Sequence, residues 1–312
     1  EGWISKRGVQ RSSPNFIALQ AMDPLLIIFF SFALSAYLLT IVLNAALIMI
    51  IAFEKALHEP MYIFLCNLCV NDLCGTTGFY PRALVYLLTE TNRISFEECI
   101  VQCLAIVMYA TGEFTNLSVM AVDRYIAICQ PLRYHSIMSP FAVRSLVTFI
   151  WIFPFFIGVL AISLALKHPL CRYDMNRLFC EHLTLLNLAC KQDIFQGIIN
   201  GFIYISKAVF VLISYFKIIL ACRKSKVNQE KFFSTCVPHL ISFLNYIACV
   251  FFDSSQTEFR AKSLPRMLYT FLTVIFLIVP PVVNPVIYGI KLSPVRAKIL
   301  IIYSLSCTIY IT

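Results

Sequence analysis

The chain has 312 residues, of which 60% are apolar and 13% are charged. Soluble domains are nearer half apolar and a quarter charged, so a soluble enzyme of this length is nearly excluded. A β-barrel is disfavoured because its strands would alternate polar and apolar residues. The net charge of +9 suits anionic lipid headgroups, and the basic residues form no continuous stripe for nucleic acid. Lipid is therefore the expected solvent, and helices are the expected way of crossing it.

Seven stretches of the chain are long and apolar enough to span a membrane as helices. In chain order they are Pro24–Phe53, Pro60–Leu88, Cys99–Ile128, Phe141–Leu166, Ile194–Ala221, Phe232–Asp253 and Leu264–Ile290. Lys291–Tyr303 then alternates basic and apolar residues, which predicts a short amphipathic helix on the membrane surface. We therefore predict an all-α membrane protein, a seven-transmembrane helix bundle. The bundle covers residues 24–290, with a tail at 1–23 and the amphipathic C-terminal helix and tail at 291–312.

The positive-inside rule orients this bundle only weakly. Lys and Arg are equally frequent on its two sides. Long loops count less and the cluster Lys217–Lys231 is dense, so we favour the side of that cluster as cytoplasmic, with the N-terminus outside.

One connection, Lys167–Asp193, is much longer than the others and must fold on itself or dock on the helix ends. The cysteines on its side of the bundle are Cys99, Cys171, Cys180 and Cys190. They could form disulfides if that side is extracellular, but their spacing does not choose a pairing. A zinc site that adds His168 or His182 is the alternative, although the ligand spacing is irregular.

The third span carries charged chemistry at one end. Arg124 lies 25 residues, or about 37 Å of helix, after Cys99, so the two residues mark opposite membrane surfaces. Asp123, Arg124 and Tyr125 follow one another at the inner surface. A solvated helix end is the simpler interpretation of the acid–arginine pair, and spacing alone does not decide between that and a switch.

Two carboxylic acids lie deep within predicted spans. Asp72 is about 18 Å from the inner end of its helix and Glu113 about 16 Å from Arg124, so their depths are similar. Ionisable groups at this depth are costly, face the bundle interior and usually serve a function. Two close carboxylates share a proton or hold a hard cation, and Asn44 and Asn284 could join as neutral ligands. A hydrogen-bonded structural network is the alternative.

Several motifs occur in the order of a known family. They are LHEPMY at Leu57–Tyr62, MAVDRYIAIC at Met120–Cys129 with PLRY after it, Ser214–Tyr215, KFFSTC at Lys231–Cys236 with His239–Leu240, and NPVIY at Asn284–Tyr288. Together they resemble the olfactory receptors, a branch of the rhodopsin-like G-protein-coupled receptors, from about residue 24 to about residue 300. The resemblance implies that the N-terminus is extracellular.

The resemblance also assigns roles to residues of this chain. It implies a switch for a G protein made of Asp123, Arg124, Tyr125, Tyr215, Asn284, Pro285 and Tyr288. It implies a sodium-type pocket made of Asn44, Asp72, Glu113 and Asn284. It implies two disulfides, Cys99–Cys180 and Cys171–Cys190, that fasten a lid over a binding cavity. Interfacial anchors are the alternative for Tyr215 and Tyr288, and Pro285 predicts a kink in either case.

A small-molecule pocket is expected in the outer half of the bundle. One face of the third span carries, at helical spacing, Cys103, Ile106, Val107, Ala110 and Thr111. The usual pocket of the family adds Ile199 and Ile203 of the fifth span, Val250, Phe251 and Ser254 of the sixth, and Val274 of the seventh. This lining is mostly apolar with a few hydroxyls, as in most small-molecule cavities. Ordinary packing is the alternative for each residue.

The resemblance implies an odorant receptor in the plasma membrane of an olfactory sensory neuron. A small-molecule odorant would bind it, and a stimulatory, olfactory-type G protein would raise cAMP. We expect no catalysis, no nucleic-acid partner and no cofactor apart from a sodium ion. One alternative is a rhodopsin-like receptor for an endogenous messenger. Another is an ion- or proton-coupled transporter that uses Asp72, Glu113 and Lys207, although the chain lacks the internal repeat usual in transporters.

The chain also departs from the pattern of the family. No N-glycosylation sequon precedes the first span, and Asn116–Ser118, which fits the pattern, lies inside the membrane. Asn245–Ala248 replaces the aromatic–glycine element of the sixth span, and Pro238 precedes His239. Lys207 stands midway along the fifth span, where it would pair with Glu113, neutralise an acidic ligand or extend to the membrane surface. These departures concern the ligand rather than the class of receptor.

Overall fold

The computed structural model describes residues 24–89, 94–167, 237–249 and 275–291, with shorter stretches at 169, 171, 179–180, 182–188, 190, 209, 213, 216 and 295–296. Every regular element within these residues is a helix. The long helices are α1 (Pro24–Phe53), α2 (Pro60–Thr89), α3 (Phe96–Cys129), α5 (Pro140–Ala165) and α10 (Ile275–Lys291). The short elements are 3-10 turns at Lys55–Leu57 and Pro131–Arg133, α4 (Tyr134–Ile137) and α6 (His182–Leu188). A further apolar helix covers Val237–Cys249.

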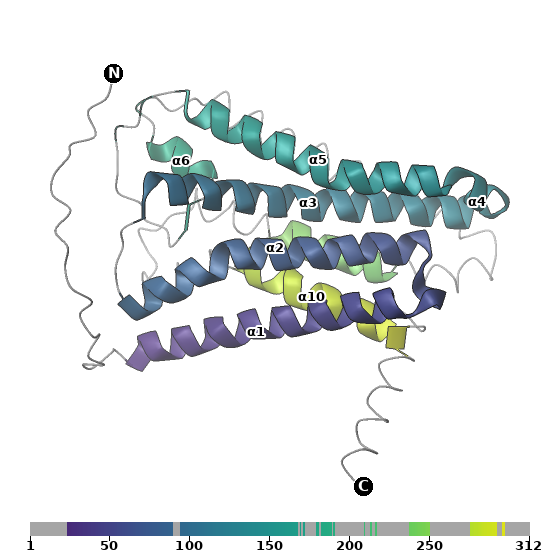
Figure 1. Cartoon of the computed structure of the whole chain (residues 1–312), viewed down its shortest axis with the longest axis horizontal. Helices are drawn as coiled ribbons and strands as arrows, with labels where there is room; N and C mark the ends of the chain where they lie inside the picture. The colour runs from purple at the N-terminus through teal and green to yellow at the C-terminus, as the bar shows by residue number, and fades with distance from the viewer. Residues whose placement is uncertain are drawn as a thin grey trace, which may run out of the picture.

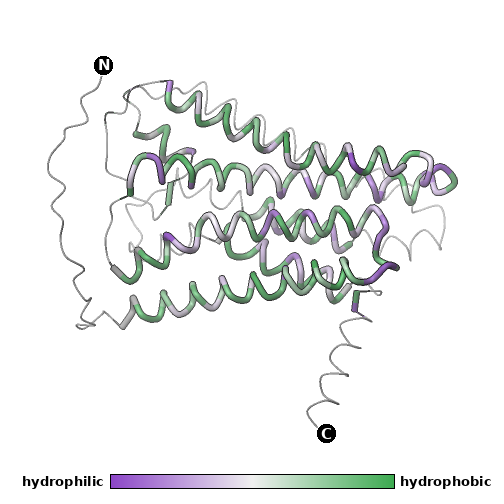
Figure 2. Tube along the Cα trace, viewed as in Figure 1, coloured by the Kyte–Doolittle hydropathy of each residue, from purple (hydrophilic) through white to green (hydrophobic). Residues whose placement is uncertain are grey.

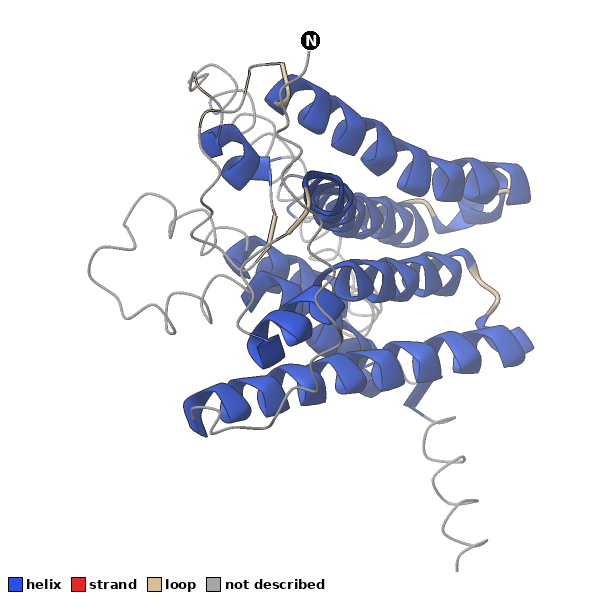
Figure 3. Cartoon of the chain, turned by 60° about the vertical axis from the view of Figure 1, so that its left-hand side comes forward, coloured by secondary structure: helices blue, strands red, loops and turns tan. Residues whose placement is uncertain are grey.

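The long helices α1, α2, α3 and α5 run side by side along the long axis of the molecule, and α10 packs against α1 and α2 (Figure 1). The same arrangement is seen after a turn of 60° (Figure 3). The central helix is α3, which packs against both α2 and α5. Of its most apolar stretch 61% is buried, against 22% in α1 and in α5. We call the end of the bundle with Asp123 and α4 the inner end, and the end with Cys99 and α6 the outer end.

Three of the described helices are long and apolar enough to cross a membrane: Ile27–Phe53 of α1, α3 and α5. Most of α1 and α5 is coloured hydrophobic in Figure 2, and both helices leave large apolar side chains exposed. Phe32 of α1 is 47% exposed and Phe156 of α5 is 64% exposed. Such surfaces belong against lipid chains rather than water.

The predicted spans agree with the helices wherever both are described. The bounds of α1 are those predicted, and those of α2, α3 and α5 differ by at most three residues at either end. Within the predicted fifth span, Val209, Ile213 and Phe216 are helical. The rest of that span, and nearly all of the predicted amphipathic helix Lys291–Tyr303, lie outside the described residues.

The N-terminus of α3 shows why its helix begins earlier than predicted. The Ser95 Oγ accepts from the Glu98 backbone N–H at 3.1 Å, and Glu98 Oε2 accepts from the Ser95 N–H at 3.1 Å. This capping box provides acceptors for two N–H groups that the helix itself leaves unpaired. Glu97 and Glu98 also place negative charge on the positive end of the helix dipole. The helix therefore starts at Phe96, three residues before the predicted Cys99.

Within the described residues, buried apolar side chains form three clusters. The inner cluster contains 21 buried residues, among them Leu68, Leu117, Phe243, Tyr246 and Tyr288. The outer cluster consists of Ala36, Phe79, Tyr80, Ala83, Ile106, Tyr109, Phe179, Cys249 and Leu277. The lid cluster consists of Cys99, Cys103, Ile162, Ala165, Cys180 and Leu185. Because α3 contributes to all three, it ties the two ends of the bundle together.

Candidate functional site

At the inner end of α3 an acid–arginine pair is buried. Asp123 is 0% exposed and Arg124 is 7% exposed. Arg124 Nε donates to Asp123 Oδ2 at 2.8 Å, and Nη2 contacts the same oxygen. The Tyr134 hydroxyl donates to Asp123 Oδ1 at 2.7 Å. Both carboxylate oxygens therefore have partners, and the pair is not the solvated helix end that is its simpler interpretation.

Tyr134 belongs to this group although the sequence did not assign it a role. It starts α4, the short helix that follows the PLR turn, and it is half-buried. Burial, and secondly the charge of Asp123, raises the pKa of the Tyr134 hydroxyl. The phenol therefore stays protonated and acts as the donor to Asp123. Its place at the end of the PLRY string was the one signal available in the sequence.

A second buried pair joins α10 to the Val237–Cys249 helix. His239 Nδ1 lies 3.0 Å from the Tyr288 hydroxyl, and the two rings are 5.1 Å apart between centroids. Tyr288 is 0% exposed, so it is a contact between helices and not an interfacial anchor. His239 belongs to a motif of the sequence that assigns it no role. Of the other predicted switch residues, Tyr125 is half-buried against the inner cluster, and Tyr215 lies outside the described residues.

The two buried carboxylic acids meet in the middle of the bundle. Asn284 Nδ2 donates to Glu113 Oε1 at 2.7 Å and lies 3.4 Å from Asp72 Oδ2. All three side chains are 0% exposed. A single amide from α10 thus bridges an acid of α2 and an acid of α3. The expectation of similar depth is met by this contact.

Asn71 is a further member that the sequence did not reveal. Its Nδ2 donates to the Tyr109 carbonyl at 3.1 Å and lies 3.4 Å from Glu113 Oε2. A side chain on Gly112 would collide with Asn71 Oδ1, so only glycine admits Asn71 here. Glu113 therefore receives an amide donor on each oxygen, one from α2 and one from α10.

Asn44 connects α1 to the proline-rich helix α10. The ring of Pro285 removes the N–H that would bond to the Pro281 carbonyl, four residues earlier. Asn44 Nδ2 donates to that carbonyl at 2.8 Å and to the Thr40 carbonyl at 2.9 Å. Pro285 therefore frees the Pro281 carbonyl, and Asn44 of α1 supplies the donor that this carbonyl lacks within its own helix.

Three oxygen atoms of this group have no hydrogen-bond partner among the described residues: Asn44 Oδ1, Asp72 Oδ1 and Asn284 Oδ1. All three residues are 0% exposed. Oxygen atoms of carboxylates and amides are the ligands that hard cations prefer. The donor set of the predicted sodium-type pocket thus fits such an ion by chemistry. No cluster of three His, Cys, Asp or Glu that could hold a metal occurs in the described part of the chain.

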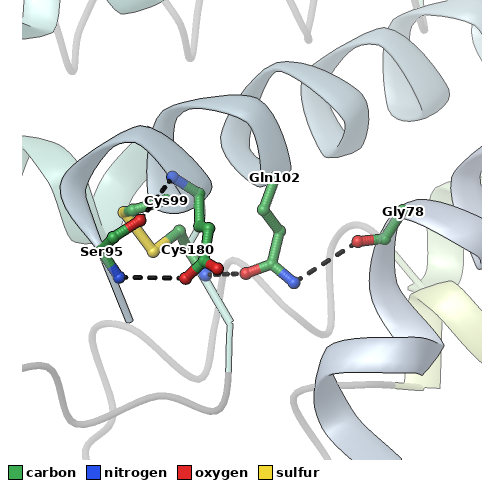
Figure 4. Close-up of a disulfide and its surroundings, with 6 residues drawn as sticks. Gly78, Ser95, Cys99, Gln102 and Cys180 are labelled. Atoms are coloured by element: carbon green, nitrogen blue, oxygen red, sulfur yellow. Dashed lines mark hydrogen bonds between the residues drawn. A yellow bond between two sulfur atoms is a disulfide. The ribbon is translucent and has the colours of Figure 1, made fainter. Parts of the chain in front are cut away.

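At the outer end the structure forms both expected disulfides. Cys99 is bonded to Cys180 and Cys171 to Cys190. Gln102 supports the first bridge: its Oε1 accepts from the Cys180 N–H at 2.9 Å, and its Nε2 donates to the Gly78 carbonyl at 3.4 Å (Figure 4). Because all four cysteines are disulfide-bonded, they are not available as zinc ligands. Gln102, which the sequence did not single out, fastens the loop to both α3 and α2.

The predicted ligand residues of α3 are buried or half-buried but do not share one environment. Cys103 lies in the lid cluster and Ile106 in the outer cluster, while Val107 packs against the lid cluster. The Ala110 carbonyl accepts from the Tyr246 hydroxyl at 2.7 Å, and the Thr111 carbonyl accepts from Thr115 Oγ1 at 2.7 Å. Lys207 lies outside the described residues. So do the remaining predicted ligand residues, which are Ile199, Ile203, Val250, Phe251, Ser254 and Val274.

Comparison with known proteins gives one consistent result. A family described as olfactory receptor matches residues 32–305. Human olfactory receptor 52D1 is 34% identical over 272 residues, which are 85% of each chain. Canine olfactory receptor-like protein OLF4 is 32% identical over 279 residues, 86% of this chain and 89% of the relative. Murine olfactory receptor 1M1 is 33% identical over 280 residues, 86% of each chain.

Proposed function

The chain belongs to the olfactory receptor family of G-protein-coupled receptors, and we propose that it binds a small odorant in the outer half of its bundle and activates a stimulatory, olfactory-type G protein that raises cAMP. It is a multi-pass helical membrane protein of the seven-transmembrane class, and not an enzyme. We also propose that it lies in the plasma membrane of an olfactory sensory neuron, with residues 1–23 outside the cell and residues 291–312 inside.

The observation that carries the proposal is the buried group at the inner end. Arg124 is held by Asp123, which Tyr134 also holds from α4. The Val237–Cys249 helix is held against α10 by His239 and Tyr288. These bonds are not covalent, so the closed arrangement can exchange with one in which the Val237–Cys249 helix moves outward. An odorant that favours the open arrangement would expose the inner surface to the G protein.

The loop after α3 offers a contact for that G protein. Leu132 is fully exposed at the inner end, next to the exposed Arg133 and Pro131. An isolated exposed leucine beside a basic residue suits a partner with an apolar pocket and an acidic rim. Leu132 therefore supports the proposal from the side of the partner.

The odorant pocket is proposed from the sequence assignments and from one contact. Among the assigned residues, Ile106 and Ala110 lie on the face of α3 toward the outer cluster and the Val237–Cys249 helix. Through the bond from Tyr246 to the Ala110 carbonyl, a ligand that contacts α3 at this depth could act on the Val237–Cys249 helix. Tyr246 thus takes the place of the missing aromatic–glycine element as the aromatic residue that contacts α3.

The proposed role of the buried acids is a sodium or proton site that biases the two arrangements. It draws on Asp72, Glu113, Asn284 and Asn44, and Asn71 joins them as a donor to Glu113. Two carboxylates bridged by one amide repel each other when both are charged. They therefore either hold a cation between them or share a proton. Because Asn284 belongs to α10, a change in the charge of the acids would be felt by that helix.

The proposal is tested by Arg124→Ala in cells with a cAMP reporter and a broad odorant panel. We expect the variant to reach the cell surface but to give no odorant-dependent rise in cAMP. Arg144→Ala, which removes an exposed arginine from the first turns of α5 at the same end of the bundle, is the matched control and should retain the response. A normal response of Arg124→Ala would contradict the switch, and ion flux without a G protein would favour the transporter alternative.

A further inference from the structure

Tyr80 is a buried phenol in the outer third of α2 whose hydroxyl has no assigned use. It lies 20 residues, or about 30 Å, after Pro60 at the inner end of the helix. Tyr80 is 0% exposed. Its ring stacks on Tyr37 of α1 with centroids 4.9 Å apart, and it meets the edge of Phe79 at 5.2 Å. The hydroxyl has no hydrogen-bond partner within the described residues.

Three other tyrosines bond through their hydroxyls within the protein. Tyr246 donates to the Ala110 carbonyl at 2.7 Å, Tyr288 pairs with His239 at 3.0 Å, and Tyr134 donates to Asp123 at 2.7 Å. A buried hydroxyl without a partner is unfavourable, and native structures rarely keep one without a reason. A phenylalanine would fill the same volume in the outer cluster without this penalty.

The surroundings of Tyr80 are apolar and are held in place by the lid. Phe179 of the lid is buried, and its ring meets the ring of Phe79 edge to face with the centroids 5.3 Å apart. Phe179 is followed by Cys180, which is bonded to Cys99. Gln102 ties Cys180 to Gly78, two residues before Tyr80, as Figure 4 shows. The lid, α2 and α3 are thus fixed around one phenol.

The outer cluster also decides which ligand the phenol could accept. Its members are apolar apart from the Tyr80 and Tyr109 hydroxyls and the Cys249 thiol. A carboxylate or ammonium group would lose its hydration there, and none of these members would carry the opposite charge. A phenol hydroxyl, in contrast, both donates and accepts a hydrogen bond. Ile106, one of the residues assigned to the odorant pocket, belongs to the same cluster.

We propose that the Tyr80 hydroxyl is a hydrogen-bonding contact for the ligand, and that it selects neutral, mainly apolar molecules with one oxygen function, such as an alcohol or an aldehyde. The proposal rests on the function proposed above, since it names the class of odorant. It places part of the pocket against α2 and against α10, whose Leu277 belongs to the same cluster. One polar group in an apolar lining is the usual means of orienting a small ligand.

The test compares octanol and octanal with octane on the purified full-length receptor, by thermal unfolding, and on cells with the cAMP reporter. Both oxygenated probes should stabilise the wild type, and Tyr80→Phe should lower their apparent affinity and potency about tenfold, as loss of one hydrogen bond does. Octane should have the same effect on wild type and on Tyr80→Phe, both on the unfolding temperature and on the cAMP signal. Without any probe, Tyr80→Phe should be no less stable than wild type.

Tyr246→Phe is the matched control, because it removes the same atom from a buried phenol whose partner is known. It should lower stability without any probe, unlike Tyr80→Phe. The proposal is overturned if Tyr80→Phe leaves the probes unaffected, if it destabilises the receptor without probe, or if neither oxygenated probe binds the wild type. A receptor that binds the probes through Tyr80 but raises no cAMP would contradict only the proposed coupling.

Discussion

The two ends of the bundle are held together by different chemistry. At the inner end, charged and polar side chains hold each other through hydrogen bonds: Asp123 with Arg124 and Tyr134, and His239 with Tyr288. At the outer end, two disulfides and two apolar clusters do the same work. Hydrogen bonds exchange partners readily and disulfides do not. The difference suggests a rigid receiving end and an inner end that can rearrange.

The strongest test of the rigid end removes its central bridge. The pair Cys99→Ser with Cys180→Ser opens a link between residues 81 apart and should cost about 4 kcal/mol of unfolding free energy. We expect most of the receptor to be lost from the cell surface, as measured by labelling of intact cells. Cys66→Ser, which changes a free, half-buried thiol of α2, is the control. Wild-type surface levels in the double variant would mean that the apolar clusters alone suffice.

The middle of the bundle is tested by Glu113→Ala. Its loss takes one acceptor from the Asn284 amide and one from the Asn71 amide, which should cost about 2 kcal/mol. In wild type, sodium should raise the unfolding temperature above that in potassium at equal ionic strength, because a ligand of the folded state stabilises it. That difference should vanish in Glu113→Ala and in Asp72→Asn. If wild type does not distinguish the two ions or respond to pH, the acids form only a structural network.

A smaller effect is expected at the attachment of the lid. Gln102→Leu keeps the size of the side chain but leaves the buried Cys180 N–H without its acceptor, at a cost of about 1 kcal/mol. The unfolding temperature should fall by a few degrees, and odorant potency should fall with it. Val101→Leu, one residue earlier at a position 67% exposed, should change neither. Equal stability of Gln102→Leu and wild type would show that the disulfide alone orients the lid.

The smallest expected effect is a dependence on pH at α6. Burial lowers the pKa of the His182 imidazole, which a bond to the Ala161 backbone only partly opposes. The unfolded chain then binds this proton more readily than the folded one, so stability falls as the pH drops through the unfolded pKa of about 6.5. His182→Gln should reduce the loss of unfolding temperature between about pH 7.5 and about pH 5.5. His135→Gln, at an exposed position of α4, should leave that loss unchanged.

The sequence predicted the helices better than the contacts between them. Long apolar runs that begin at Pro24, Pro60 and next to Pro140 define α1, α2 and α5, because length and hydropathy act along a single helix. The paired acids were also predictable, since depth follows from spacing. Asn71 and Tyr80 were not, because their importance depends on how α2 is rotated against its neighbours. The cysteine pairing came from the resemblance, as spacing does not contain it.

The bond between Asn44 and Pro281 has a consequence for biosynthesis. It joins α1 to α10 across 237 residues. During synthesis α1 enters the membrane long before α10 exists, so Asn44 Nδ2 can donate to the Pro281 carbonyl only at the final stage of assembly. Until then the Asn44 amide can donate to the Thr40 carbonyl of its own helix, and lipid offers it no second acceptor. Quality control in the cell could thus distinguish a finished receptor from a truncated one by this single amide.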